Sequence, residues 1–352
     1  MPSPKKFIKH LSAIGKILVV RLSSIGDIIL TTPLLRSLKT TYPKAHITFL
    51  IKKQYEELLS NSPYIDELIT FNQKEGFEGL KKIKQYLRQQ QFDLYLDIHK
   101  NWRSRFIRWN LGAKEITSYH KLIFRRTLLI WFKLNLYRKV KPVYERYFDS
   151  VKKLGIHYDG HGTDIQVPES KTEKVKKALE DAGYSFKTPL VIICPSATYF
   201  NKRWKAEGFI RVAHHLVRNK SAYIVVLGGP EDKILCKSIA EGIGESSVNL
   251  AGSLSLAESA ALLHLATLVI ANDSGLLHLA QSQKSPVVAI YGPTTRELGY
   301  FPIENKSTVI EIPLYCRPCT HNGLDKCPQK HFRCMNDISP DRVIEATLQY
   351  IP

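Results

Sequence analysis

Short apolar runs alternate along the first third of the chain with stretches whose apolar residues recur every three or four positions. Runs at residues 16–22, 46–51 and 92–99 predict strands, and residues 27–40 and 77–90 have the spacing of helices. Strands that alternate with helices are typical of a parallel sheet covered by helices. The first third therefore predicts an α/β domain.

The same alternation starts again in the second half. Residues 206–218 and 256–266 have helical spacing, and apolar runs predict five strands around them. These strands cover residues 189–195, 222–229, 247–252, 268–273 and 286–292. Residues 160–169 are polar, contain Gly, Asp and Pro, and form the expected linker. We therefore expect two α/β domains, at residues 1–162 and 163–352.

Residues 101–146 have a different composition. Basic and aromatic side chains interleave there, and the only acids are Glu115 and Glu145. This pattern predicts helices with one cationic face. The face is either solvated above inward-packed aromatic rings, or it binds an anionic ligand with its tryptophans, Trp102, Trp109 and Trp131, at a membrane interface.

The whole chain is strongly basic. Its 352 residues carry a formal net charge of +19, which predicts attraction to nucleic acid, an acidic membrane face or a phosphorylated substrate. Hydrophobic residues make up 44% of the chain, a globular composition that argues against long disordered stretches. No apolar run reaches the roughly 18 residues of a membrane span, and the N-terminal stretch lacks the cleavage site of a secretory signal. We expect a cytoplasmic protein.

A turn with a single glycine follows the first predicted strand. In RLSSIGDIILTTP, residues 21–33, Gly26 stands alone where a phosphate-binding turn has several glycines, and Asp27 follows it. The carboxylate either caps the helix or acts on a ligand as a base. A dehydrogenase is disfavoured, because its cofactor site needs more glycines here and an acid at the end of the second strand, where Ile-Lys-Lys stands.

The stretch NDSGLLHLA follows a strand of the second half. Ser274 and Gly275 open a helix there, and free N–H groups at a helix start bind anions. Gly275 lets a ligand approach the backbone, and His278 lies one turn on, on the same side as Ser274. The alternative is an ordinary helix cap with a packed histidine.

Two further loops follow strands of the same predicted sheet, and ligands of such sheets gather at the strands' carboxyl ends. In PSATYFNKRW, Thr198 and Lys202 could contact a diphosphate, whereas Trp204 is expected to pack in the core. In LGGPEDK, Glu231 either accepts bonds from ribose hydroxyls or is a routine acid at a helix start. Each loop alone is equally compatible with an ordinary polar turn.

Together, RLSSIGDIILTTP, PSAT…NKRW, GGPED, NDSGLLHLA and AIYGPT resemble glycosyltransferase family 9, the heptosyltransferases of lipopolysaccharide inner-core synthesis. Their order and spacing match over most of the chain, and residues 100–158 match only in character. The resemblance implies the GT-B architecture, an α/β fold of two Rossmann-like domains whose parallel sheets face a cleft. It also implies inverting, metal-independent transfer of heptose from ADP-heptose to a hydroxyl of the Kdo–lipid A or heptosyl-Kdo acceptor.

The resemblance implies roles for individual residues. Asp27 matches the proposed catalytic base, which would take the proton of the acceptor hydroxyl. The positions that match the donor site are Thr198, Lys202, Glu231, Asp273, Ser274, Gly275 and His278. The positions expected to meet the acceptor are Ser23, Ser24, Gly26, Arg103, Arg105, Arg125 and Arg126.

Four cysteines lie close together near the C-terminus: Cys316, Cys319, Cys327 and Cys334. The first pair is Cys-x-x-Cys, which is compatible with a structural zinc site, a disulfide or reduced thiols. Catalysis is expected to need no cofactor. We expect a monomer that makes peripheral contact with the anionic inner face of the inner membrane. Nucleic acid is not expected, because no reading motif is evident, and another nucleotide sugar or non-enzymatic polyanion binding are the alternatives.

Overall fold

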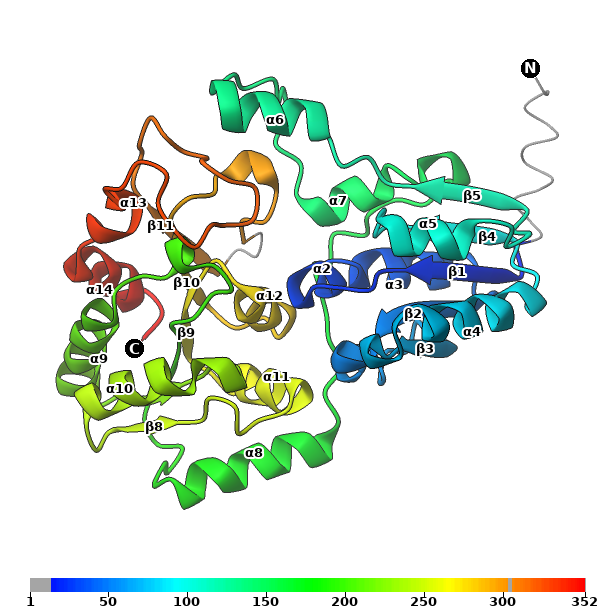
Figure 1. Ribbon diagram of the computed structural model, residues 1–352. Helices are drawn as coiled ribbons and strands as arrows, with labels where there is room; N and C mark the ends of the chain where they lie inside the picture. The colour runs from blue at the N-terminus through cyan, green and yellow to red at the C-terminus, as the bar shows by residue number, and fades with distance from the viewer. Residues whose placement is uncertain (1–13, 303–305, 352) are drawn as a thin grey trace. The chain divides into compact units, whose positions relative to one another are not determined.

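The computed structural model of the protein describes residues 14–302 and 306–351, so residues 1–13, where we expect no secretory signal, lie outside it. The chain divides into two compact units, each built on its own sheet (Figure 1). Unit 1 comprises Met1–Lys121 and Val143–Gln166, and unit 2 comprises Leu122–Pro142 and Val167–Pro352. The last crossing, from Gln166 to Val167, falls inside the polar stretch expected as the linker.

Unit 1 contains a parallel sheet with the strand order β3-β2-β1-β4-β5. Its strands are β1 (Lys16–Val20), β2 (His46–Lys52), β3 (Glu67–Phe71), β4 (Leu94–Asp97) and β5 (Glu115–Ser118). The three strands expected in this region are confirmed as β1, β2 and β4. Apolar residues of the central strands, such as Leu18, Leu50 and Tyr95, form one buried core with residues of the covering helices.

The helices of unit 1 follow its strands, as the alternating pattern predicts. They are α2 (Ile25–Ile29), α3 (Thr32–Thr41), α4 (Gly76–Gln89), α5 (Trp102–Arg108) and α7 (Val143–Phe148), with short 3₁₀ helices η1 (Lys53–Leu58), η2 (Gln73–Glu75) and η3 (Lys152–Leu154). The single helix expected over residues 27–40 is wrong, because the chain breaks it at Leu30 and Thr31. Pro33 explains the break, since its ring excludes a hydrogen bond to the carbonyl four residues earlier.

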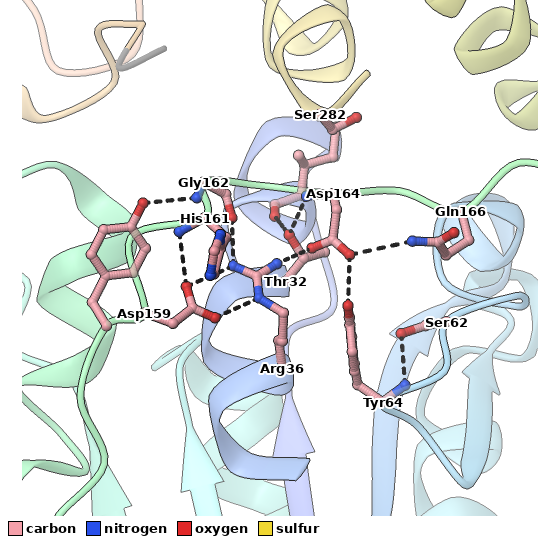
Figure 2. Close-up of polar contacts among 12 residues, drawn as sticks. Thr32, Arg36, Ser62, Tyr64, Asp159, His161, Gly162, Asp164, Gln166 and Ser282 are labelled. Carbon is pink, nitrogen blue, oxygen red and sulfur yellow. Dashed lines mark hydrogen bonds and ion pairs between the residues drawn. The ribbon is translucent and has the colours of Figure 1, made fainter. Parts of the chain in front are cut away.

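Arg36 ties α3 to the segment that leads out of unit 1 (Figure 2). Its guanidinium bonds both carboxyl oxygens of Asp159 at 2.5 and 2.8 Å, Asp164 at 2.5 Å and the carbonyl of Gly162 at 2.9 Å. Asp164 is held further by the hydroxyl of Tyr64 at 3.1 Å. One arginine therefore fixes the course of the chain just before it enters unit 2.

Unit 2 contains a six-stranded parallel sheet with the order β11-β10-β9-β6-β7-β8. Its strands are β6 (Leu190–Cys194), β7 (Tyr223–Val226), β8 (Ser247–Asn249), β9 (Leu268–Asn272), β10 (Val287–Tyr291) and β11 (Ser307–Glu311). The five strands expected here are confirmed, and β11 is an additional edge strand. The four central strands β6, β7, β9 and β10 are buried almost throughout, which explains their continuous apolar sequences.

Most helices of unit 2 lie around this sheet (Figure 1). They are α6 (Ile123–Phe132), α8 (Glu169–Asp181), α9 (Ala206–Lys220), α10 (Lys233–Ile243), α11 (Leu256–His264), α12 (Gly275–Ser282), α13 (Arg333–Asn336) and α14 (Pro340–Leu348), with 3₁₀ helices η4 (Phe200–Lys202), η5 (Pro230–Asp232) and η6 (Arg296–Leu298). Trp204 packs in the core, as expected, against Phe209. Gly208 leaves room for it, because a Cβ there would lie 2.5 Å from the indole ring.

Helix α6 belongs to unit 2, although its sequence position lies within the range expected for the first domain. The guanidinium of Arg126 lies 3.0 Å from the ring nitrogen of His321. At the end of the helix, Lys133 donates to the carbonyls of Cys316 and Pro318 at 2.9 and 2.8 Å. These contacts join residues more than 180 positions apart, so sequence periodicity alone cannot reveal them.

Within the two described ranges, none of the helices combines the length and the apolar character that crossing a bilayer would require.

We predict that Arg36→Met destabilises the protein by about 2 kcal/mol, because it leaves two partly buried carboxylates without their cation. Urea unfolding at pH 7 measures this. Lys81→Met is the matched control, since its pair with Glu78 is exposed and its loss should change stability by less than about 0.5 kcal/mol. Equal losses for the two variants would contradict the role of Arg36.

The difference in stability between wild type and Arg36→Met should also depend on pH. The hydrogen bond from Arg36 lowers the pKa of Asp159 below its ordinary value. A carboxyl group with a lowered folded pKa contributes stability above its unfolded pKa, near 4, and loses it as the pH falls through the folded value. The difference between wild type and Arg36→Met should therefore be full at pH 7 and narrow below about pH 4.

Candidate functional site

Each sheet has one point where the strand order reverses, and open parallel sheets bind ligands at the carboxyl ends of the strands there. In unit 1 the reversal lies between β1 and β4, and in unit 2 between β6 and β9. Asp27 lies in the helix after β1, while Thr198 and Asp273 follow β6 and β9. The predicted residues therefore lie at the place in each sheet where parallel topology favours a ligand.

In unit 1, Asp27 is held by two neighbours. Its Oδ2 atom forms an ion pair with Arg21 at 2.6 Å, and it accepts hydrogen bonds from the hydroxyl and the backbone N–H of Ser24 at 3.0 and 3.3 Å. Ser24 is the N-cap of α2, so Asp27 also closes the capping box of this helix. The alternative that Asp27 caps the helix is therefore confirmed, and its role as a base stays a prediction.

Arg21 connects the loop after β1 to the loop after β4. The residue is buried, with 6% of its surface exposed. Besides Asp27, its guanidinium donates to the carbonyl of Ser23 at 2.8 Å and to the carbonyl of Ile98 at 2.6 Å. No role was predicted for Arg21, which is the first residue after β1.

The charge of Arg21 decides the protonation of Asp27. Burial raises the pKa of this carboxyl, but the charge of Arg21 and the hydrogen bonds from Ser24 and Arg21 outweigh it, so the pKa lies below its ordinary value. Asp27 is therefore ionised at neutral pH and can accept a proton.

His99 lies close to Asp27 and to several cations at the same edge of the sheet. Burial lowers the pKa of His99 to about 3, and the charges of Arg21, Lys121 and Lys52 contribute to the shift. Lys52 ends β2, and its own pKa is lowered by burial and then by the charge of Arg103. His99 is therefore neutral at pH 7 in a cationic setting suited to an anionic ligand. Neither His99 nor Lys52 was predicted, although both stand at strand ends.

The structure distributes the expected acceptor residues over both units. Ser23 is half-buried, Ser24 exposed and Gly26 buried in the turn before Asp27. Arg103 and Arg105 lie on α5 of unit 1, and the guanidinium of Arg103 lies over the ring of Trp102 at 4.5 Å. Arg125 and Arg126 lie on α6 of unit 2. The four arginines are therefore divided between the two units, with two on each.

In unit 2, Asp273 lies at the centre of the predicted donor residues. It is buried directly after β9, and its Oδ2 atom contacts the ammonium of Lys202 at 2.6 Å and the hydroxyl of Thr294 at 2.8 Å. This joins the loops after β6, β9 and β10. Thr294 follows β10 in the AIYGPT stretch and was not predicted as a site residue.

Helix α12 begins beside Asp273. Ser274 is its N-cap and Gly275 its first residue. The hydroxyl oxygen of Ser274 is buried and makes no hydrogen bond within the described residues, so its hydrogen-bonding capacity is available to a ligand. His278 is buried one turn further, with its ring 6.2 Å from the ring of Tyr300.

The remaining donor residues lie on exposed loops. Thr198 is exposed in the loop after β6, and Glu231 is exposed in η5 after β7. The backbone N–H of Gly229 donates to Asp232 at 2.9 Å, so Asp232 caps this turn, and the exposed Glu231 has its carboxylate beside Gly229. The loops after β6, β7 and β9, which carry the predicted donor residues, thus lie at the same edge of one parallel sheet.

Two asparagines hold the loop after β6 in place. Asn272, at the end of β9, donates to the carbonyl of Pro195 at 2.6 Å and accepts from the N–H of Trp204 at 3.2 Å. Asn201 exchanges hydrogen bonds with the backbone of Leu324 at 2.8 and 3.1 Å. Gly323 allows this close approach, since it has φ +129° and a Cβ there would lie 2.4 Å from Tyr199.

The four C-terminal cysteines are free thiols in this structure. Cys316 and Cys334 are buried, and burial raises the pKa of Cys334 to about 12. Among the residues that the structure covers, no three His, Cys, Asp or Glu side chains are grouped as a metal ion would require. The zinc site stays a prediction that these side-chain positions do not support.

Comparison with known proteins decides the family. The family model described as glycosyltransferase family 9 (heptosyltransferase) matches residues 80–329. The chain belongs to glycosyltransferase family 9. It is therefore a glycosyltransferase of the heptosyltransferase family, and the resemblance carried by its motifs is confirmed.

Relatives match this family 9 chain along nearly its whole length. A Haemophilus ducreyi protein named lipooligosaccharide heptosyltransferase 2 is 28% identical, over 96% of this chain and 99% of its own. The crystal structure of a family 9 glycosyl transferase from Veillonella parvula is 26% identical with a TM-score of 0.81, covering 96% of this chain and 97% of the other. An Escherichia coli structure titled ADP-heptose lps heptosyltransferase II is 23% identical with a TM-score of 0.75, covering 96% and 98%. The two parallel α/β units are those of the GT-B fold, as expected.

We predict that Asn272→Ala destabilises the protein by about 2–3 kcal/mol, because it leaves a buried N–H and a buried carbonyl without partners. Thermal unfolding followed by circular dichroism measures the loss. Asn219→Ala is the control, since Asn219 is exposed and bonds one carbonyl of its own helix. A melting temperature equal to that of wild type would show that Asn272 does not hold the loop.

Proposed function

We propose that this family 9 enzyme is an inverting, metal-independent heptosyltransferase that moves heptose from ADP-heptose to a hydroxyl of the lipopolysaccharide inner core. The family assignment and the names of the Haemophilus ducreyi and Escherichia coli relatives support this donor and acceptor class. The single observation that carries the chemistry is Asp27, held ionised by Arg21 at the reversal point of its sheet.

Asp27 is the base of this reaction. The acceptor oxygen attacks the anomeric carbon, the bond from that carbon to the donor phosphate breaks, and the acceptor proton passes to Asp27. A carboxylate whose pKa is lowered is a weak base. It suffices, because an alcohol oxygen that has begun to bond to carbon gains positive charge and releases its proton readily. Arg21 therefore sets a late proton transfer and keeps the carboxylate ionised over a wide pH range.

Lys202, the start of α12 and Ser274 stabilise the departing diphosphate. The ammonium of Lys202 is held by Asp273 next to the N-cap hydroxyl of Ser274. A diphosphate there gains a cation, free backbone N–H groups and the hydroxyl together, and preorganised donors of this kind lower the barrier of charge-separating steps. These groups carry the role that a divalent cation has in other nucleotide-dependent transferases.

The cations beside Asp27 fit an acidic acceptor. Lys52 and Lys121 lie close enough to His99 for their charges to shift its pKa, and Arg103 acts in the same way on Lys52. Kdo carboxylates and the phosphates of lipid A are anions that such a group binds. We infer that the acceptor enters from this edge of unit 1, with Arg105 on the same helix as Arg103. The enzyme is expected to act as a monomer at the cytoplasmic face of the inner membrane.

We predict that Asp27→Asn lowers the rate of transfer by roughly 10²–10⁴-fold, because the amide cannot accept the proton. The measurement is heptose transfer from ADP-heptose to truncated lipopolysaccharide, with ADP affinity by calorimetry. ADP affinity should stay unchanged, since Asp27 belongs to the acceptor side. Asp181→Asn, at an exposed position of α8, controls for general effects. Normal turnover in Asp27→Asn would remove the base assignment.

We predict that Lys202→Ala weakens ADP binding roughly 10–100-fold, because one charge-assisted bond is lost and Asp273 then repels the diphosphate. Calorimetric titration with ADP, without added divalent cations, measures the change. Lys205→Ala is the matched control three residues on, at an exposed position. If both variants bind ADP equally well, Lys202 is not the diphosphate contact.

A further inference from the structure

Helix α6 and the segment after it present large apolar side chains to solvent. Phe124, Trp131 and Phe132 are each more than 70% exposed. Phe124 and Trp131 are seven residues apart and therefore share one side of the helix. Further exposed apolar residues extend this surface along the chain: Ile123, Leu134, Leu136 and Val140. We call the three aromatic residues the α6 patch. Exposed apolar groups in one such cluster mark an interaction surface.

The side chains on the opposite side of α6 already have their contacts within unit 2. Leu129 is buried, Arg126 contacts His321, and Lys133 caps the last turn through carbonyls of the cysteine-rich segment. Leu129, Arg126 and Lys133 therefore attach α6 to the rest of unit 2. The aromatic side chains of the α6 patch are not needed for that attachment.

The α6 patch differs from the other exposed tryptophans of the basic segment. Trp102 lies under the guanidinium of Arg103, and Trp109 lies under the ammonium of Lys84 at 4.8 Å. Both rings, at the first residue of α5 and just after its last, thus have cationic partners within unit 1. No ring or cation contact is recorded for the α6 patch within residues 14–302 and 306–351. Of the three tryptophans expected at a membrane, Trp131 is the one whose ring has no such partner.

The charge around the α6 patch selects an anionic partner. Residues 116–144 contain no Asp or Glu, and Lys or Arg stands at seven of these positions. Arg125, Arg138 and Lys139 are exposed close to the patch in sequence. Tryptophan and phenylalanine on one side, with flanking cations, are typical of helices that lie in the interface of an anionic bilayer.

We propose that the α6 patch is the membrane-docking surface of the enzyme, with Phe124, Trp131 and Phe132 entering the boundary between headgroups and acyl chains. Arg125, Arg138 and Lys139 then meet the lipid phosphates. The surface belongs to unit 2, the unit with the donor residues. The proposal rests on the proposed function only for the choice of a lipid-linked acceptor; the docking itself is a property of α6.

The test is co-sedimentation with vesicles of phosphatidylcholine and phosphatidylglycerol that contain no glycolipid. Phe124→Ser/Trp131→Ser/Phe132→Ser should lower the partition coefficient at least about tenfold, because the buried apolar area is lost. Trp102→Ser/Trp109→Ser should change it less than about twofold. Pure phosphatidylcholine or high salt should weaken wild-type binding. Equal partitioning of wild type and the α6 triple variant would overturn the proposal.

A spectroscopic readout covers the case in which the triple variant unfolds. A protein with Trp102→Phe and Trp109→Phe keeps Trp131 as its exposed tryptophan beside buried Trp204. Its emission should shift to shorter wavelength on these vesicles, and an unchanged spectrum with bound protein would overturn the proposal. If light scattering shows an oligomer that the triple variant dissociates, with vesicle binding unaffected, the patch is a self-association surface instead.

Failure of this proposal and failure of the proposed function give different results. Asp27→Asn should bind vesicles like wild type although its heptose transfer is strongly slowed. The α6 triple variant should keep its turnover on a deacylated, water-soluble acceptor and lose activity on acceptor embedded in vesicles. If wild type binds vesicles but transfers no heptose, the proposed enzymatic function is wrong and the docking proposal is unaffected.

Discussion

The ion pair of Arg21 and Asp27 is the contact on which the proposed chemistry of unit 1 depends. A buried guanidinium that also bonds the carbonyls of Ser23 and Ile98 fixes two loops, and the carboxylate it holds is the base of the proposed mechanism. Each charge makes the burial of the other tolerable. Stabilising the ionised form makes Asp27 a weaker proton acceptor. The late proton transfer proposed above is compatible with such a weak base.

Much of the fold could be predicted because parallel sheets leave a direct trace in sequence. Strands buried on both faces need uninterrupted apolar runs, and seven of the eight predicted strands are interior strands of this kind, whereas β8 is an edge strand. The donor residues were predicted from the same runs, since Thr198, Glu231 and Asp273 each follow one of them, and their role stays a prediction. Their convergence at one sheet edge follows from parallel topology, which brings all carboxyl ends together.

The parts that escaped prediction depend on contacts between distant residues or on packing. The short edge strands β3, β5 and β11 carry mixed sequences, because edges are half-solvated. Helix α6 has an ordinary amphipathic pattern, and only its bonds to His321, Cys316 and Pro318 assign it to unit 2. The neutral state of His99 results from burial among cations, which no local pattern records.

The two hydrogen bonds between Asn201 and Leu324 join two loops that are more than 120 positions apart in the sequence. A displacement of one loop is therefore passed to the other. Lys202 adjoins Asn201, so a change in the cysteine-rich segment reaches this lysine through the bonded pair. Under the proposed function, such a change alters donor affinity without altering any residue that meets the donor.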